Sequence, residues 1–158
     1  MDSTKINIRN ANCNDLLSTW AWRNDSNTRF NSLTSKKVLL REYSVWYRKN
    51  LIDKNKFNYI LFQAISMKKI AIVRFEENSR KKLVEVSINL CPKHRGKGLS
   101  KKILEISLKE FKNKYKYKII AKIKKKNVAS LKLFRSLGFF LERKNLTYFI
   151  FKYSKLSK

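Results

Sequence analysis

Two of the three glycines in this 158-residue chain stand two residues apart, at Gly96 and Gly98. They lie in the segment CPKHRGKGLSKKIL, between an alternating apolar stretch and a long amphipathic stretch. Glycine is needed where the backbone takes a positive φ angle or where a ligand comes close to the main chain. A strand–loop–helix junction also presents unpaired amide groups at the positive end of the helix dipole, which suits a phosphate. The segment therefore predicts a pyrophosphate cradle, with a plain tight turn as the alternative.

The spacing of this loop excludes two common phosphate-binding motifs and matches a third. It is not a Walker loop, and Gly-x-Gly-x-x-Gly is not completed. The run Arg95-Gly96-Lys97-Gly98-Leu99-Ser100 resembles the Arg/Gln-x-x-Gly-x-Gly/Ala loop of GNAT-type N-acetyltransferases, with Ser100 in place of Gly or Ala. The segment 127–139 is similar to the family's Asn-x-x-(Ser/Ala)-x-x-x-(Tyr/Phe)-x-x-x-Gly-Phe pattern. The resemblance covers residues 83–140 and implies a fold that binds acetyl-CoA.

The resemblance also implies which residues contact the acetyl-CoA cofactor. Main-chain groups at the end of the strand before Pro92 would hydrogen-bond the pantetheine arm and polarise the thioester carbonyl. Main-chain amides of the glycine loop would hold the pyrophosphate. The predicted cofactor-binding residues are Asn89, Leu90, Cys91, Arg95, Gly96, Lys97, Gly98, Leu99, Ser100, Lys101, Asn127 and Phe134. Cys91 is expected to be a small buried residue rather than a nucleophile, so the expected chemistry is direct attack by an amine.

The acceptor prediction comes from the first half of the chain. Residues 20–25, Thr28-Arg29, Ser32 and 41–47 resemble the pattern of the GNAT branch that acetylates nucleotide-linked amino sugars, as in pseudaminic-acid synthesis, with Tyr43 replacing the usual His. Such an acceptor needs cations for its diphosphate and aromatic faces for its rings. The predicted substrate-binding residues are Arg23, Asn24, Arg29, Trp46 and Arg74. The alternative is that the tryptophans are core residues and Arg74 is solvated.

Acetyl transfer requires a base that takes a proton from the attacking ammonium, and it requires protonation or stabilisation of the leaving thiolate. Glu85, on the polar side of the strand before the cofactor path, is the first candidate base, and Glu76 is the second. Phe134 stands where many relatives carry a tyrosine acid and cannot donate a proton. The acid therefore stays unassigned between Tyr148 and solvent.

The periodicity of apolar residues predicts the strands and helices that must position these site residues. It predicts a mixed α/β fold with a mostly antiparallel mixed sheet of about seven strands, four helices and one strand–helix–strand crossover. The resemblance implies that these elements form a GNAT-like fold with a strand–loop–helix acetyl-CoA site, in a single acetyltransferase domain of residues 1–158. The predicted strands are 5–9, 59–66, 70–77, 81–90, 119–124, 139–144 and 146–153, and the predicted helices run from 14 or 15 to about 24, 35–51, 99–115 and 128–137.

Composition limits the remaining function classes. Lys+Arg number 38 against 11 Asp+Glu, a net charge of +27, but 28 of these cations are Lys and only 10 are Arg. Since arginine is the residue that reads bases and clamps phosphates in pairs, scattered lysine is more simply a solvated surface. Two cysteines and one histidine supply no metal-ligand set. No apolar run is long enough for a membrane helix, and the N-terminus lacks the apolar segment of a signal peptide, so a cytoplasmic location is expected.

The function that these features favour is acetyl-CoA-dependent N-acetylation of a small amine, with a nucleotide-activated amino sugar as the acceptor. Two alternatives stay open: an N-acetyltransferase that modifies ribosomal proteins or peptides, and a basic RNA-binding module without catalysis. No specific nucleic-acid or membrane partner is predicted, and an exposed strand near the C-terminus could support a homodimer.

Overall fold

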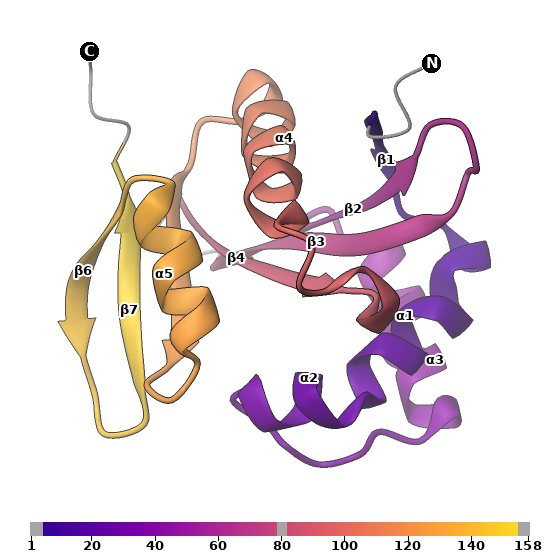
Figure 1. Ribbon diagram of the computed structural model, residues 1–158, viewed down its shortest axis with the longest axis horizontal. Coiled ribbons are helices and arrows are strands. Elements are labelled where there is room, and N and C mark those ends of the chain that lie inside the picture. The colour runs from indigo at the N-terminus through magenta and orange to yellow at the C-terminus, as the bar shows by residue number, and fades with distance from the viewer. Residues whose placement is uncertain (1–4, 79–81, 155–158) are drawn as a thin grey trace.

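The structure is a computed structural model that describes residues 5–78 and 82–154. The described residues form seven strands in one sheet, in the order β1-β2-β3-β4-β5-β7-β6 (Figure 1). The strands are β1 Ile6–Asn10, β2 Lys56–Gln63, β3 Lys69–Asn78, β4 Leu83–Leu90, β5 Lys118–Lys124, β6 Phe139–Lys144 and β7 Tyr148–Tyr153. Every neighbouring pair is antiparallel except β4 and β5, which are parallel. The predicted seven-stranded sheet is therefore confirmed, but β2 begins three residues before the predicted strand 59–66, and residues 64–66 form a turn instead of strand. Lys81, at the start of one predicted strand, lies outside the described residues.

Five α-helices and two short 3-10 helices connect the strands in the described part of the chain. They are η1 Cys13–Asp15, α1 Leu16–Asn24, α2 Ser26–Asn31, α3 Leu40–Ile52, η2 Pro92–His94, α4 Leu99–Lys114 and α5 Val128–Ser136. The predicted GNAT-like fold class is confirmed, but α2 is an additional helix, and α3 begins five residues later than the predicted Ser35. Among the described helices, none combines the length and the apolar character needed to cross a membrane.

Both faces of the sheet are covered, and the alternation along β2 and β3 shows how. Tyr59 and Leu61 belong to the core beneath α4 and α5, whereas Ile60 between them belongs to a second core beneath α1 and α3. Phe75 of β3 stacks on Phe111 of α4 with ring centroids 4.1 Å apart. The period-two pattern is therefore apolar on both sides of the sheet, as a central strand requires.

The parallel contact between β4 and β5 is short. Only residues 83–85 of β4 pair with β5, opposite residues 118–120, although β4 continues to Leu90. Beyond this contact β5 pairs with β7 through Lys124, while β3 covers the other edge of β4 along its length. The two halves of the sheet therefore separate after Glu85, and α4 crosses from one half to the other (Figure 1).

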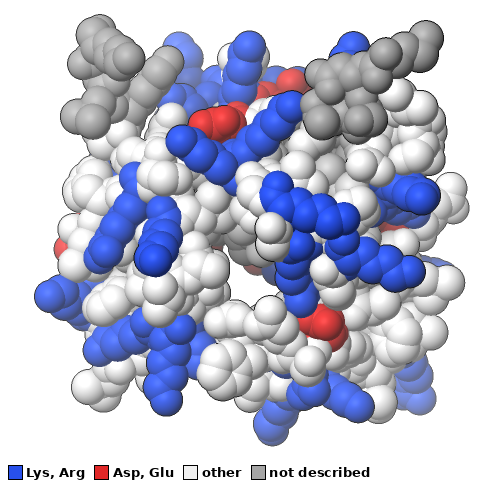
Figure 2. Space-filling model, viewed as in Figure 1, with Lys and Arg blue, Asp and Glu red and all other residues white. Residues whose placement is uncertain are grey.

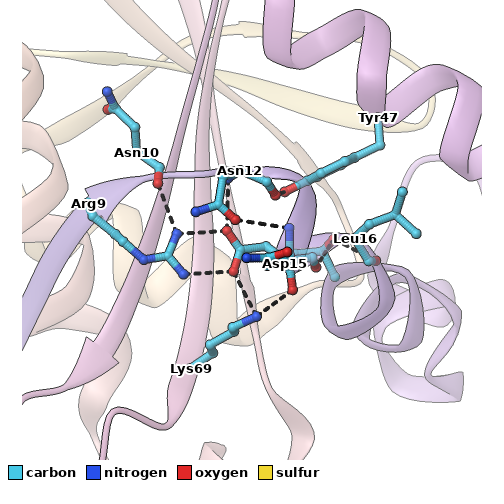
Figure 3. A network of polar contacts seen from close by, with 9 residues as sticks. Arg9, Asn10, Asn12, Asp15, Leu16, Tyr47 and Lys69 are labelled. Carbon is cyan, nitrogen blue, oxygen red and sulfur yellow. Dashed lines mark hydrogen bonds and ion pairs between the residues drawn. The ribbon is translucent and has the colours of Figure 1, made fainter.

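A buried carboxylate joins the first helix to the sheet (Figure 3). The Asp15 side chain is fully buried, accepts a bidentate pair of hydrogen bonds from Arg9 at 2.7 and 2.8 Å, and lies 2.9 Å from the ammonium of Lys69. It also accepts the main-chain N–H of Asn12. Burial alone would raise the pKa of Asp15, but the hydrogen bonds from Arg9, Lys69 and Asn12 lower it to about 2. The ionised form is therefore the one that holds β1, β3 and α1 together.

This network predicts a specific acid sensitivity. Because the folded-state pKa of Asp15 is depressed, its contribution of about 2 kcal/mol to the free energy of unfolding is present above pH 4 and is lost as pH falls towards 2. Asp15→Asn should cost about 3 kcal/mol at neutral pH, since Arg9 and Lys69 lose a buried counter-charge. Denaturant unfolding between pH 2 and 7 should show this difference from the wild type narrowing in acid, with Glu105→Gln, at an exposed position of α4, as the control. A difference that stays constant over this range would contradict the assignment.

Candidate active site

The glycine loop lies between η2, which follows the end of β4, and the start of α4. Gly96 and Gly98 have φ angles of +72° and +70°, and Gly98 is the N-cap of α4. A Cβ atom built on either glycine would meet nothing within 4 Å. The predicted unusual dihedrals are therefore confirmed, and the space beside both glycines is open to another molecule. The first turn of α4 carries no acidic residue, so its positive end is not neutralised locally.

A cavity of about 440 Å³ adjoins this loop, and we call it the α4 cavity. Its lining includes Asn27, Thr28, Asn31, Ser32, Ile88, Asn89, Leu90, Arg95, Gly96, Ser100, Asn127, Ala129, Ser130 and Leu133. Six of the predicted cofactor residues, from β4, the glycine loop and the start of α5, are thus brought together. Lys97 and Gly98 of the glycine loop, Leu99 and Lys101 of α4, and Cys91 after β4 lie outside this lining, and Cys91 is half-buried rather than buried as predicted. Figure 2 shows a hollow near the centre of the corresponding face, between α5 and α2.

The side chain of Arg95 is directed to α2. Its guanidinium donates to Asp25 Oδ1, to Thr28 Oγ1 at 2.6 Å and to the carbonyl of Leu90 at 3.2 Å. Asp25 is the N-cap of α2 and accepts the N–H of Thr28. Burial raises the pKa of Asp25, but the hydrogen bonds from Arg95 and Thr28 outweigh it and lower the pKa below the usual value. The contribution of Arg95 to a phosphate site would therefore come from its main chain.

Helix α2 spans the gap between the two halves of the sheet. On the β4 side, the hydroxyl of Thr28 donates to Asn89 Oδ1 at 3.2 Å. On the other side, Lys124 Nζ of β5 donates to the carbonyl of Phe30 at 2.8 Å, and Asn127 Nδ2 lies 3.5 Å from the carbonyl of Asn31. Asn127 also caps α5 by accepting the N–H of Ser130. The helix that the sequence did not predict is thus the element that closes this side of the cavity.

A second cavity of about 340 Å³, the β4 cavity, shares seven lining residues with the α4 cavity: Thr28, Asn31, Ser32, Ile88, Asn89, Asn127 and Ser130. Both candidate bases line it. Glu76 and Glu85 are direct partners in the β3–β4 register. Glu85 Oε2 lies 2.7 Å from the ammonium of Lys122, and this hydrogen bond raises the pKa of Lys122. Phe134 also lines this cavity and is buried, so its ring supplies an apolar wall rather than a proton.

A third cavity of about 300 Å³, the Trp46 cavity, lies on the α1–α3 side of the same strands. Arg23, Arg74 and Asn89 line both this cavity and the β4 cavity. Trp46 lines the Trp46 cavity, and the guanidinium carbon of Arg74 lies 5.2 Å from the centre of its ring. Three of the predicted acceptor residues are therefore brought together here.

The other two predicted acceptor residues have internal partners. The amide of Asn24 donates to the carbonyl of Val38 and accepts its N–H, both at 2.8 Å. Arg29 donates from Nε to the carbonyl of Asn24 and from Nη1 to that of Ser35. Neither residue lines the three cavities. Their contacts hold the segment between α2 and α3, which explains why α3 starts only at Leu40.

The sequence interpretation missed Thr28, Asn31 and Lys122 as site residues. Lys122 could be found from the sequence, because it is a charged residue within the predicted strand 119–124, which pairs with β4 at its start. Thr28 belongs to the N-terminal pattern, but its contact with Asn89 joins residues 61 positions apart, and the contact of Asn31 with Asn127 joins residues 96 positions apart, so neither contact has a local sequence signal.

The site thus combines an open, glycine-lined helix N-terminus, a strand edge without a strand partner, and two carboxylates in an adjoining cavity. A family model described as "Acetyltransferase (GNAT) domain" matches residues 5–140 of the chain. The chain therefore belongs to the GNAT acetyltransferase family. Members of this family use acetyl-CoA as the co-substrate.

Two curated relatives are similar over a short segment. The chain is 41% identical over 56 residues to an L-methionine sulfoximine/L-methionine sulfone acetyltransferase of Salmonella typhimurium. It is 43% identical over 56 residues to the L-amino acid N-acyltransferase MnaT of Escherichia coli. Each alignment covers 35% of this chain and 33% of the relative. The chain thus aligns with about a third of the length of these relatives.

Solved structures resemble the chain over almost its whole length. A spermidine N-acetyltransferase from Vibrio cholerae, solved in complex with CoA and spermine, matches with a TM-score of 0.80 at 19% identity, covering 94% of each chain. A domain from Methanocaldococcus jannaschii matches with a TM-score of 0.80 at 26% identity, covering 94% of this chain and 97% of that one. These similarities agree with the GNAT fold.

The contacts of Arg95 predict how α2 is held in place. Arg95→Met removes the donors to Asp25 and Thr28, and the loss of about 1–3 kcal/mol of charge-assisted hydrogen bonding should ease local opening. Amide exchange at residues 26–31, measured by mass spectrometry, should become about 10- to 100-fold faster than in the wild type. Lys93→Met, an exposed change in η2, is the matched control. Unchanged exchange at α2 with Arg95→Met would show that the helix is held by other contacts.

Proposed function

We propose that the protein is an acetyl-CoA-dependent N-acetyltransferase that acetylates a small amine by direct transfer. The observation that carries this proposal is the opening of the sheet after Glu85, which leaves the β5-facing edge of β4 without a strand partner next to the glycine loop. The proposal treats residues 1–158 as one acetyltransferase domain. The relatives named as amino-acid and spermidine acetyltransferases support the reaction class.

The residues present fit the cofactor. The extended edge of β4 from Val86 to Leu90 suits a pantetheine arm. The main chain of this edge and the amide groups of the arm each carry hydrogen-bond donors and acceptors along their length. Gly96 and Gly98 leave room for a pyrophosphate at the N-terminus of α4, where main-chain N–H groups point outwards. Bound acetyl-CoA supplies an acetyl thioester as the electrophile.

The mechanism assigns the proton transfer to the β4 cavity. Main-chain N–H groups of β4 stabilise the negative charge that develops on the thioester oxygen. Glu85, directly or through a water molecule, accepts the proton that the attacking ammonium must lose, and Glu76 is the second candidate. The amine nitrogen then bonds to the acetyl carbon, the carbon–sulfur bond breaks, and the second proton that the nitrogen must lose passes to solvent. The sulfur leaves with the electron pair as a thiolate, which needs no protein acid, since thiols are acidic enough to leave in this form.

The acceptor is the finer part of the proposal. The N-terminal pattern favours a nucleotide-activated amino sugar, and Arg23, Arg74 and Trp46 offer cations and an aromatic face where the Trp46 and β4 cavities meet. The named relatives act on other amines: amino acids in the curated proteins and spermidine in the Vibrio cholerae structure. Peptide acetylation and RNA binding are not favoured. Lysine and arginine are spread over the visible face in Figure 2 and do not gather into one stripe.

The proposal extends to location and assembly. The expected cytoplasmic location and the homodimer stay predictions. For the homodimer, the relevant feature is β6, which forms one edge of the sheet and exposes Phe140 and Leu141.

The cofactor assignment predicts the effect of filling the glycine loop. Gly98→Trp should abolish acetyl-CoA binding in isothermal titration calorimetry, because the indole would occupy the open space at the start of α4. The fold should survive with a loss of about 1–2 kcal/mol, the cost of a left-handed backbone for a residue other than glycine. Lys109→Trp, an exposed position on the same helix, controls for the added ring. Micromolar affinity retained by Gly98→Trp would refute the cradle.

The base assignment predicts unequal effects for two adjacent carboxylates. Glu85→Gln should lower kcat about 100-fold at neutral pH, and its residual rate should rise with pH as more of the amine is free of its proton. Glu76→Gln, the partner across the β3–β4 register, should have a clearly smaller effect. Steady-state release of the CoA thiol measures both. A larger effect at Glu76 would transfer the role to that residue, and no effect at either would remove carboxylate base catalysis from the proposal.

A further inference from the structure

The guanidinium of Arg23 contains a buried donor without an acceptor. Its Nη2 donates to the carbonyl of Thr34 at 2.9 Å. Its Nη1 is buried and has no hydrogen-bond partner among the residues that the structure describes. A buried donor left unpaired is rare in folded proteins and costs free energy, most of all when it belongs to a charged group. The site is therefore incomplete without an additional acceptor at Nη1.

The electrostatics around Arg23 define what this acceptor must be. Burial lowers the pKa of Arg23, and the positive charges of Arg74 and Arg29 lower it further. Arg74 lies 3.8 Å from Glu76 Oε1, but the other oxygen of Glu76 is 2.8 Å from Lys56. Glu42 also lines the Trp46 cavity, and its carboxylate accepts the N–H of Leu39. The carboxylates that line the two cavities are Glu42, Glu76 and Glu85, and the cations that line them are Arg23, Arg74, Lys122 and Lys124. With Lys56 and Arg29 close by, positive charges outnumber the carboxylates. A water molecule could accept one hydrogen bond from Nη1 but would not balance this charge, whereas an oxyanion does both.

The position of the two arginines connects this charge to the reaction site. Arg23 and Arg74 line both the Trp46 cavity and the β4 cavity, and the β4 cavity also contains Glu85. Across the β3–β4 register, Arg74 pairs with Ser87, two residues from Glu85 along β4. One small molecule can therefore place an amine near Glu85 and an anionic group at the arginines.

We infer that the acceptor amine carries an oxyanion, a carboxylate or a phosphate, which Arg23 binds with Arg74 at the junction of the Trp46 and β4 cavities. This inference rests on the proposed acetyltransferase function and narrows its substrate class. It disfavours a polyamine, because an amine with further positive charges would add to an existing excess of cation.

Matched pairs of small amines test the inference. L-Methionine and L-methioninamide differ at the carboxylate, glucosamine 6-phosphate and glucosamine differ at the phosphate, and spermidine represents a polycation. Binding of each is measured by calorimetry with and without CoA, and turnover is measured by release of the CoA thiol from acetyl-CoA. At least one anionic probe should bind or react about 10- to 100-fold better than its neutral partner, as expected for losing a charge-assisted hydrogen bond pair. The pair that shows the preference distinguishes a carboxylate from a phosphate.

Variants connect the preference to the residues. Arg23→Met should remove most of the preference, and Arg74→Met should weaken it, which keeps the test decisive if one variant does not fold. Arg48→Met, an exposed arginine on α3, should leave it unchanged. The inference is overturned if neither anionic probe binds, if each neutral partner or spermidine does equally well, or if the preference survives in both site variants. A wild-type protein that does not bind acetyl-CoA would instead refute the proposed function. The titrations of the amines without CoA test the oxyanion site separately, because they do not depend on acetyl-CoA binding.

Discussion

The separation of β4 from β5 after Glu85 is the constraint on which the rest of the site depends. Parallel pairing over residues 83–85 keeps the sheet continuous, while α4 carries the chain across the gap. The β5-facing main chain of β4 is then left with donors and acceptors that no strand satisfies, and the facing edge of β5 is likewise unpaired beyond Ile120. Such an edge needs either a covering element or a ligand. Helix α2 covers only part of it, through Thr28 and Asn89, and the remainder faces the cavities.

Polar contacts between distant segments hold the N-terminal half against this gap. Asp15 joins α1 to β1 and β3 from within the core, and Arg95 joins the glycine loop to the start of α2. Both contacts use a forked guanidinium, whose planar geometry fixes direction as well as distance. The helix α2 has six residues and contains no buried side chain, so its own propensity cannot hold it. Its position is therefore a property of the loop and the sheet, and the shape of the cavities follows from these few bonds.

The parts of this molecule that follow local rules were predictable from its sequence. Alternating apolar residues placed all seven strands, and the scarcity of glycine located the loop with positive φ angles. The parts set by long-range contacts were not. The segment SNTRFN has no apolar period, Asn24 delays α3 by binding the main chain of Val38, and Glu76 meets Glu85 only through strand register. The unpaired donor of Arg23 depends on burial, which composition does not report.

The contrast between lysine and arginine explains why a charge of +27 says little about specificity. Lysines spread over the surface create a field that attracts any polyanion, including the phosphates of a cofactor, and salt screens that field over about 10 Å. Such a field raises encounter rates without choosing a geometry. The arginines at the cavities differ because burial weakens screening and their forked donors require an acceptor at a fixed position. On the proposed acceptor site, discrimination among acceptors is therefore expected from Arg23 and Arg74, and it should persist at salt concentrations that suppress the attraction of the surface.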